Sequence, residues 1–330
     1  MRDSSLSLGF TILRRLGHML FVMFGISVLV FLIFFATPGS DPAARIAGRN
    51  ASPQTVALIR KEFGLDRPLP VQYIRMMDSL VVKRNLTSFV NLGEKVVPAV
   101  FHAAPVTLSL VAGAATIWIV FAILVGLLAA AYKDRVIDRI LMIASLIGIS
   151  IPVFWLGEVV NLIAQGGLHK TWLFSWVPPL GYVPLRRNPA LWFKSLLLPW
   201  CTLAVAFIGI YGRVLRANII EAMQEDYIRL ARAKGLSSRA VLIRHALRCS
   251  LIAIFTLFGL DFGALVGGGA LLVEVVFGLP GVGYLTYQAL TNLDLPMIMA
   301  TVIYASFFVV AANALVDILY SVFDPRVRDD

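Results

Sequence analysis

Long apolar segments without charged residues constrain this chain more than any other feature of its sequence. A helix of about 20 predominantly apolar residues is long enough to cross a lipid bilayer. Six segments meet this requirement, four of them without any charge and two with a single acidic residue. The sequence therefore predicts an all-α, polytopic membrane protein with six transmembrane helices. The six segments are Leu16–Ser40, Val96–Tyr132, Ile140–Ile163, Ser195–Gly212, Leu251–Val273 and Leu295–Val316.

The composition excludes several other classes of protein. Hydrophobic residues make up 59% of the chain and charged residues 15%, whereas about 25% of a soluble domain is charged. These values argue against a soluble enzyme, a disordered chain or a coiled coil. The net charge of +10 would suggest nucleic acid in a soluble protein. In a membrane protein, basic residues beside the spans mark topology instead, so no nucleic-acid partner is expected.

The basic residues predict the orientation of the helices. If six helices alternate in direction, four short basic segments lie on the same side of the membrane. The positive-inside rule makes that side cytoplasmic, and it gives little weight to a long translocated segment such as 38–100. Both termini are therefore predicted to be cytoplasmic, and the first apolar run is too long for a cleaved signal peptide. The four segments contain Arg14 and Arg15, Lys133–Arg139, Arg213–Arg248, and Arg326 and Arg328.

The chain divides into a first span at 1–37, an external subdomain at 38–100 and a five-helix core at 101–330. The external subdomain has a helical pattern, in which Ser52 is the expected N-cap, Pro53 the first helical residue and Gly64 the terminator. Two interpretations of this subdomain stay open: a packing cap over the helices, or a docking surface for an external partner. Its apolar stripe is Val56, Leu58, Ile59 and Phe63.

The cytoplasmic loop 213–250 has the pattern of a helix–turn–helix. Apolar and charged residues alternate at helical spacing over 218–234, and Gly235 is placed to end that helix. Ser237 or Ser238 can cap a second helix that begins near Arg239 and continues into the fifth span. A basic amphipathic helix at this position can bind anionic lipid, or it can dock in a groove on a protein partner. The pattern alone leaves both possibilities open.

Motifs for catalysis and metal binding are absent from the sequence. It contains no phosphate-binding P-loop, no zinc-protease motif and no hydrolase nucleophile motif. We therefore expect neither a catalytic site nor a metal site. Acidic residues inside spans are costly and are candidates for function. The candidates for a substrate pathway are Glu158, Asp261 and Glu274, although Glu158 and Glu274 could instead be solvated at the external interface.

Three glycines in the fifth span are spaced for close helix packing. Gly259, Gly263 and Gly267 follow one another at intervals of four residues, which lets two helices approach closely. The packing could occur inside this chain or at a subunit interface. The run Gly267–Gly269 also weakens the helix and predicts a bend there.

The cytoplasmic loop carries a recognisable motif. The sequence DYIRLARAKGLS at 226–237, followed by RHALR at 244–248, resembles the EAA loop of ABC-importer permeases. The chain is similar to the B-type permease subunit of the dipeptide, oligopeptide and nickel class over nearly its whole length. It departs from the class at Ala253, where proline is usual. Other similar segments are Pro38–Ala43, Phe63–Pro68, Ser150–Trp155, Leu279–Gly283 and Asp324–Arg326.

This resemblance implies a permease subunit in the bacterial inner membrane that carries short peptides. Its partners would be a second related permease, two cytoplasmic ATPases, an external solute-binding protein and membrane lipid. ATP and Mg would bind the ATPases, and no cofactor would bind this chain. Helix 218–235 would be the coupling helix that receives the motion of an ATPase. The implied coupling residues are Asp226, Tyr227, Ala231, Arg232, Ala233 and Gly235.

Two alternatives are kept. The same architecture could import nickel, a metal chelate or glutathione. A different class, the ion-coupled secondary transporter, would require inverted repeats and half-helices, and the span pattern shows no such repeat.

Overall fold

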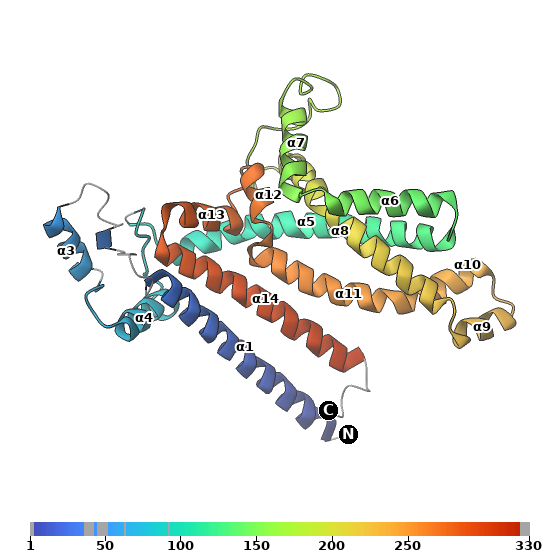
Figure 1. Ribbon diagram of the computed structural model, residues 1–330, viewed down its shortest axis with the longest axis horizontal. Coiled ribbons are helices and arrows are strands. Elements are labelled where there is room, and N and C mark those ends of the chain that lie inside the picture. Colours follow the sequence, from blue (N-terminus) through green and yellow to red (C-terminus); the bar gives the residue numbers. More distant parts are fainter. Residues whose placement is uncertain (1–2, 36–42, 45–51, 63, 92, 324–330) are drawn as a thin grey trace. The chain divides into compact units, whose positions relative to one another are not determined.

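A computed structural model describes residues 3–35, 43–44, 52–62, 64–91 and 93–323 of the chain. These residues are mostly helical, and their only bridge between extended segments joins Thr87 and Lys95. The motifs predicted at 38–42, Phe63 and 324–328 lie outside the described residues. The helices are α1 (Asp3–Phe35), α3 (Pro53–Glu62), α4 (Leu69–Met77), α5 (Val96–Ala131), α6 (Val136–Ser150), α7 (Val153–Gln165), α8 (Pro189–Ala222), α9 (Asp226–Ala233), α10 (Ser238–Val241), α11 (Leu247–Ala264), α12 (Leu271–Val276), α13 (Val282–Asn292) and α14 (Leu295–Phe323), with short π-helical turns at Asp78–Val82, Leu242–Ala246 and Leu265–Gly269 (Figure 1).

The predicted all-α membrane architecture is confirmed, with one correction to the third span. Five helices among the described residues are long and apolar enough to cross a membrane. The third predicted span is two helices, α6 and α7, which meet at an angle of 95°. The break lies at Ile151, whose backbone is extended, and at Pro152. Proline disfavours the helical conformation of the residue before it and lacks an N–H for the helix, so the bend follows from the sequence.

The fourth and fifth spans also differ from their predicted bounds. Helix α8 begins at Pro189, where the Asn188 side chain accepts a hydrogen bond from the Leu191 N–H at 3.1 Å, and it continues to Ala222. The fifth span is helical from Ser238 and is interrupted at Gly268, whose φ is +116°. The predicted bend at the three glycines is therefore confirmed, and residues from Leu271 onwards form the separate helix α12.

The chain forms two compact units. The first unit contains residues 1–105, 266–271 and 281–330. Helices α1 and α14 pack along each other, and α4 contacts α1. Its core includes Phe31, Met76, Leu80 and Ile298.

Helix α3 of this unit begins and ends as predicted. The Thr55 N–H donates to Ser52 Oγ at 3.1 Å, and Pro53 is the first residue of α3. Gly64 has a φ of +65°, and the Leu65 N–H bonds to the Arg60 carbonyl at 2.8 Å. The predicted apolar stripe is less well supported, because Leu58 is 69% exposed.

Asp294, the residue just before α14, binds the segment that precedes α5. Its carboxylate accepts hydrogen bonds from the Ser88 hydroxyl and, at 3.1 Å, from the Phe89 N–H. The Ser88 hydroxyl oxygen in turn accepts from the Val90 and Asn91 N–H groups. Ser88 and Asp294 are both buried, so these hydrogen bonds satisfy polar groups that water does not reach.

The second unit contains residues 106–265 and 272–280 and is organised around α8. Helices α6, α7 and α11 all contact α8. Glycines permit these close approaches: a Cβ added at Gly209 would lie 2.6 Å from the Ser145 carbonyl oxygen of α6. One added at Gly212 would lie 2.9 Å from Val125 of α5.

We predict that Gly209→Ala destabilises the protein, because the new methyl group meets a helix backbone that cannot move away cheaply. Overpacking of this kind costs about 1–3 kcal/mol, which corresponds to a fall of roughly 1–4 °C in Tm for a chain of this length. The measurement is thermal unfolding of the purified chain in detergent. Gly25→Ala is the matched control, since an added Cβ at Gly25 has nothing within 4 Å. Equal Tm values for the two variants would contradict the helix contact at Gly209.

Candidate functional site

The loop between α8 and α11 contains a short, separate helix. The sequence pattern predicts one helix over 218–234, and this prediction is wrong at its start, because residues up to Ala222 complete α8. Glu225 has extended backbone angles and begins the new helix α9 at Asp226. The Asp226 carboxylate lies in the first turn, where the positive end of the helix dipole favours it.

The turn after α9 agrees with the prediction. Gly235 has a φ of +82°, a region where residues with a Cβ are strained. The Leu236 N–H bonds to the Ala231 carbonyl at 3.3 Å and the Gly235 N–H to the Arg232 carbonyl at 2.9 Å, which is the Schellman motif. Ser237 then caps α10 by accepting a hydrogen bond from the Ala240 N–H at 3.3 Å. The two helices are thus joined by a turn with a defined geometry.

Burial separates α9 into two faces. Ile228 and Ala231, three residues apart, are buried against the rest of this chain. The resemblance implies a coupling role for Ala231, and in the structure its side chain is buried against this chain. We call the exposed residues of α9 its outer face; they are Asp226, Tyr227, Arg229, Leu230, Arg232 and Ala233.

The outer face combines apolar surface with charges. Leu230 is 63% exposed and Tyr227 is 40% exposed, and sequence reasoning missed Leu230 as an outward residue. Arg229 Nη1 lies 3.2 Å from Asp226 Oδ1, an exposed ion pair of the kind that contributes less than about 1 kcal/mol. Desolvation, with the neighbouring Cys249 and Glu225, raises the pKa of the Tyr227 phenol to about 12. Tyr227 is therefore neutral at physiological pH and can pack against apolar surface or donate a hydrogen bond.

An ion pair next to this loop was not anticipated. Arg216 of α8 donates from Nε and Nη2 to the two carboxylate oxygens of Asp138 in α6, each at 2.6 Å. The Asp134 N–H adds a third hydrogen bond to Asp138 at 2.9 Å. Asp138 is only 3% exposed. The sequence marks Arg216 only as a topology signal, and the one clue to the pair is the acidic residue Asp138 in the first turn of α6.

The candidate pathway acids occupy different environments. Asp261 in α11 is half-buried and accepts a hydrogen bond from the Tyr211 hydroxyl at 2.6 Å. Glu274 in α12 is fully buried and accepts one from Thr107 Oγ1 at 2.6 Å, so the alternative of a solvated Glu274 is wrong. Glu158 in α7 is exposed. In the part of the chain that the structure describes, no three His, Cys, Asp or Glu side chains gather as metal ligands.

The three glycines of the fifth span also have different surroundings. A Cβ added at Gly267 would lie 2.8 Å from the carbonyl oxygen of Ala305 in α14, so Gly267 permits a close approach inside this chain. Gly263 is buried and Gly259 is half-buried.

Comparisons with known proteins agree with this architecture. Residues 122–329 match the family of inner membrane components of binding-protein-dependent transport systems, and residues 8–111 match the N-terminal family of such components. A protein of Brucella abortus (strain 2308), named as a peptide transport system permease, is 40% identical over 97% of this chain and 99% of its own length. A protein of Escherichia coli (strain K12), named as a D,D-dipeptide transport system permease, is 35% identical over 95% and 96%. A glutathione transport system permease of Salmonella paratyphi A is 34% identical over 96% and 98%.

We predict that the Asp138–Arg216 pair shows strong coupling in a double-mutant cycle. Arg216→Gln leaves a buried carboxylate without its cation and costs about 3–5 kcal/mol, whereas Asp138→Asn with Arg216→Gln costs less than the two single changes together. The measurement is equilibrium or thermal unfolding of the purified chain. The exposed pair offers a control, because Asp226→Asn should change stability by less than about 1 kcal/mol. Additive effects at Asp138 and Arg216 would contradict the ion pair.

Proposed function

The chain belongs to the family of binding-protein-dependent transport system inner membrane components, and on this premise we propose that it is the permease subunit of an ABC importer for short peptides. The observation that carries the peptide assignment is the 40% identity, over 97% of the chain, to proteins named as peptide transport system permeases. Glutathione is the second candidate substrate, because a glutathione permease is 34% identical over nearly the same length. Both candidates are small peptides.

We further propose the partners that such an importer requires. A second related permease would complete the pathway, two cytoplasmic ATPases would bind ATP and Mg, and an external solute-binding protein would deliver the substrate. This chain would carry no catalytic site or cofactor of its own. It would span the bacterial inner membrane within membrane lipid, with both termini in the cytoplasm. The external segment 38–100 would contribute to the surface that meets the binding protein.

The proposed coupling mechanism starts at α9. Its outer face would sit in a groove of an ATPase subunit, with Tyr227 and Leu230 as the apolar contacts and Asp226, Arg232 and Ala233 around them. Ile228 and Ala231 hold the opposite face of α9 against this chain. Because the Gly235 turn and the Ser237 cap fix α9 to α10, a displacement of α9 would be passed on to α11 rather than absorbed in the loop.

Movement of α9 would also reach α6. The loop begins where α8 ends, and Arg216 ties α8 to Asp138 at the start of α6. A helix pair joined by a bidentate ion pair tends to move as one body, since separating the charges leaves both unpaired. We propose that α6 and α8 move together during transport. Among the acids, Glu158 and Asp261 are the proposed pathway residues, and Glu274 would reach the pathway only if α12 leaves Thr107.

Reconstitution tests the proposed function. The complex of this chain with its permease, ATPase and binding-protein partners is placed in proteoliposomes, and uptake of a radiolabelled dipeptide is measured. We expect uptake that requires ATP and the binding protein and that unlabelled di- and tripeptides suppress. Suppression by glutathione or a nickel chelate but not by dipeptides would overturn the peptide assignment. Uptake without ATP that an ionophore abolishes would instead support a secondary transporter.

The coupling role of the α9 turn gives a second prediction. Gly235→Asp places a Cβ and a charge at a position with a φ of +82° on the proposed ATPase surface. We expect normal insertion into the membrane, loss of co-purifying ATPase and at least a tenfold fall in uptake, measured in cells and in proteoliposomes.

Gly181→Asp is the matched control for this change. Gly181 also has a positive φ, +124°, and open space around an added Cβ, but it lies in the loop between α7 and α8 and not in the cytoplasmic loop. If both variants lose uptake equally and retain the ATPase, the effect is general backbone strain and the coupling assignment for Gly235 fails.

A further inference from the structure

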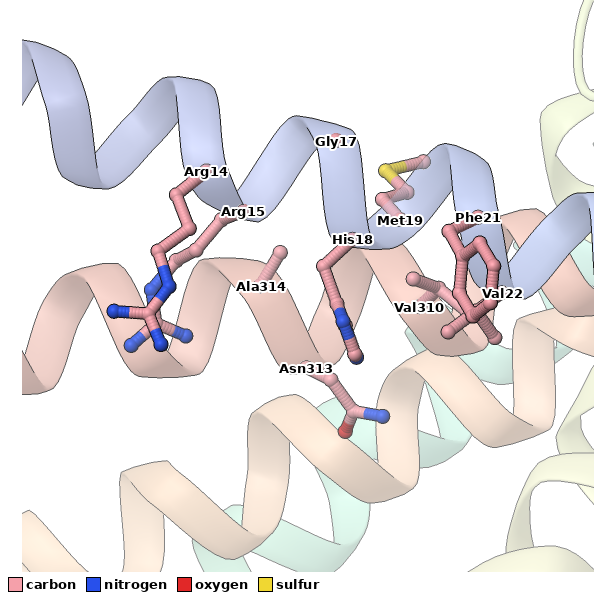
Figure 2. A pocket seen from close by; sticks show the side chains of 10 residues that line it. All are labelled: Arg14, Arg15, Gly17, His18, Met19, Phe21, Val22, Val310, Asn313 and Ala314. Carbon is pink, nitrogen blue, oxygen red and sulfur yellow. The ribbon is translucent and has the colours of Figure 1, made fainter.

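A groove in the first compact unit lies between α1 and α14 and has a volume of about 770 Å³. Figure 2 shows the side chains of Arg14, Arg15 and His18 extending from α1 toward α14, where Asn313 faces the same space. One end of the groove is therefore lined by cationic and hydrogen-bonding groups. The two guanidinium groups come from consecutive residues of one helix turn.

The other end of the groove is apolar. Phe21 and Val22 of α1 and Val310 of α14 line it. Phe21 is 73% exposed, and only 17% of the apolar stretch Gly17–Phe34 is buried, so this side of α1 is open to the surroundings. Aromatic and aliphatic side chains exposed on a transmembrane helix are matched by lipid acyl chains. The groove thus passes from a polar end to an apolar end along α1.

The polar end lies at the level of lipid headgroups. The apolar stretch of α1 begins at Gly17, and Arg14 and Arg15 precede it by less than one helical turn. A basic pocket between transmembrane helices at this depth suits an anionic headgroup. The guanidinium fork of arginine matches the oxygens of a phosphate in a bidentate manner, which a single ammonium group does not.

We propose that this groove binds one anionic glycerophospholipid. Arg14 and Arg15 hold its phosphate, His18 and Asn313 hydrogen-bond the ester or glycerol oxygens, and one acyl chain lies along Phe21 and Val22. Charge complementarity selects this occupant: a zwitterionic lipid brings a cationic group to the two arginines and loses most of the attraction. A topology signal needs only the charges, whereas a lipid site also needs the groove, His18 and Asn313.

Native mass spectrometry of the assembled complex tests the site. The complex is titrated in detergent with palmitoyl-oleoyl phosphatidylglycerol or with the phosphatidylcholine of the same chains. We expect phosphatidylglycerol to bind at least tenfold more tightly. Replacing Arg14 and Arg15 by Gln should reduce that affinity at least fivefold, because a basic residue near the headgroups contributes about a factor of five and Arg15 already interacts within the chain. Inorganic phosphate at millimolar concentration should not displace the lipid, since it lacks the acyl chains.

Arg186 and Arg187 provide the matched control. They are also consecutive arginines and both are exposed, but they lie in the loop before α8. Replacing this pair by Gln removes the same charge and should leave phosphatidylglycerol binding unchanged. Equal losses in the two double variants, or equal binding of the two lipids by the unaltered complex, would overturn the proposal.

A second variant keeps both arginines in place, so that a change of topology cannot explain the result. An added Cβ at Gly17, which lines the groove, has nothing within 4 Å. Gly17→Trp should therefore be accommodated and should fill the space of the lipid, reducing phosphatidylglycerol binding at least tenfold. Unchanged binding in this variant would place the bound lipid elsewhere and refute the site.

Discussion

Every backbone N–H and C=O inside a bilayer must find a partner within the protein, and the rest of this structure depends on that requirement. It explains why the described residues of each span are helical and why departures from helix are confined to a few positions. Where a helix ends, the chain restores the lost hydrogen bonds locally. The same pair of bonds closes α3 at Gly64, α9 at Gly235 and α12 at Gly278, each time with a glycine at positive φ. A single local device therefore sets the ends of three helices with different surroundings.

Buried and half-buried acidic side chains also find hydrogen-bond partners within the protein. Asp138 is paired with Arg216, Asp261 with Tyr211, Glu274 with Thr107, and Asp294 with Ser88. Each hydrogen bond joins residues at least 50 positions apart in the chain. Such pairs offset the cost of removing polar groups from water and fix which helices lie together. A conformational change in this subunit must either carry a pair intact or exchange its partner for another.

The sequence predicts the elements of this fold better than it predicts their contacts. Charge-free runs locate the spans, and Ser52, Gly64, Gly235 and Ser237 mark helix ends, because each signal acts within a few residues. The bend at Ile151–Pro152 has a local cause as well. The start of α9 was misplaced, since apolar spacing continues across Met223–Glu225 and hides the turn. The partner of Asp138 could not be predicted, because several arginines of the segment 213–250 were equally plausible until the packing of α6 against α8 was known.

Helix α8 is much longer than the membrane is thick, and this length affects how its two ends can move. Its 34 residues extend about 51 Å, whereas the hydrocarbon core of a bilayer is about 30 Å thick. The helix is therefore longer than the hydrocarbon core requires, and α9 follows its C-terminal end. If α8 tilts by about 10° about the bilayer centre, a point about 25 Å away along the helix moves by about 4 Å. A small rotation of α8 among its packed neighbours would therefore displace the following loop by several ångström. Conversely, a displacement of α9 by a few ångström would require only a small rotation of α8 inside the membrane, where close packing tolerates only small adjustments.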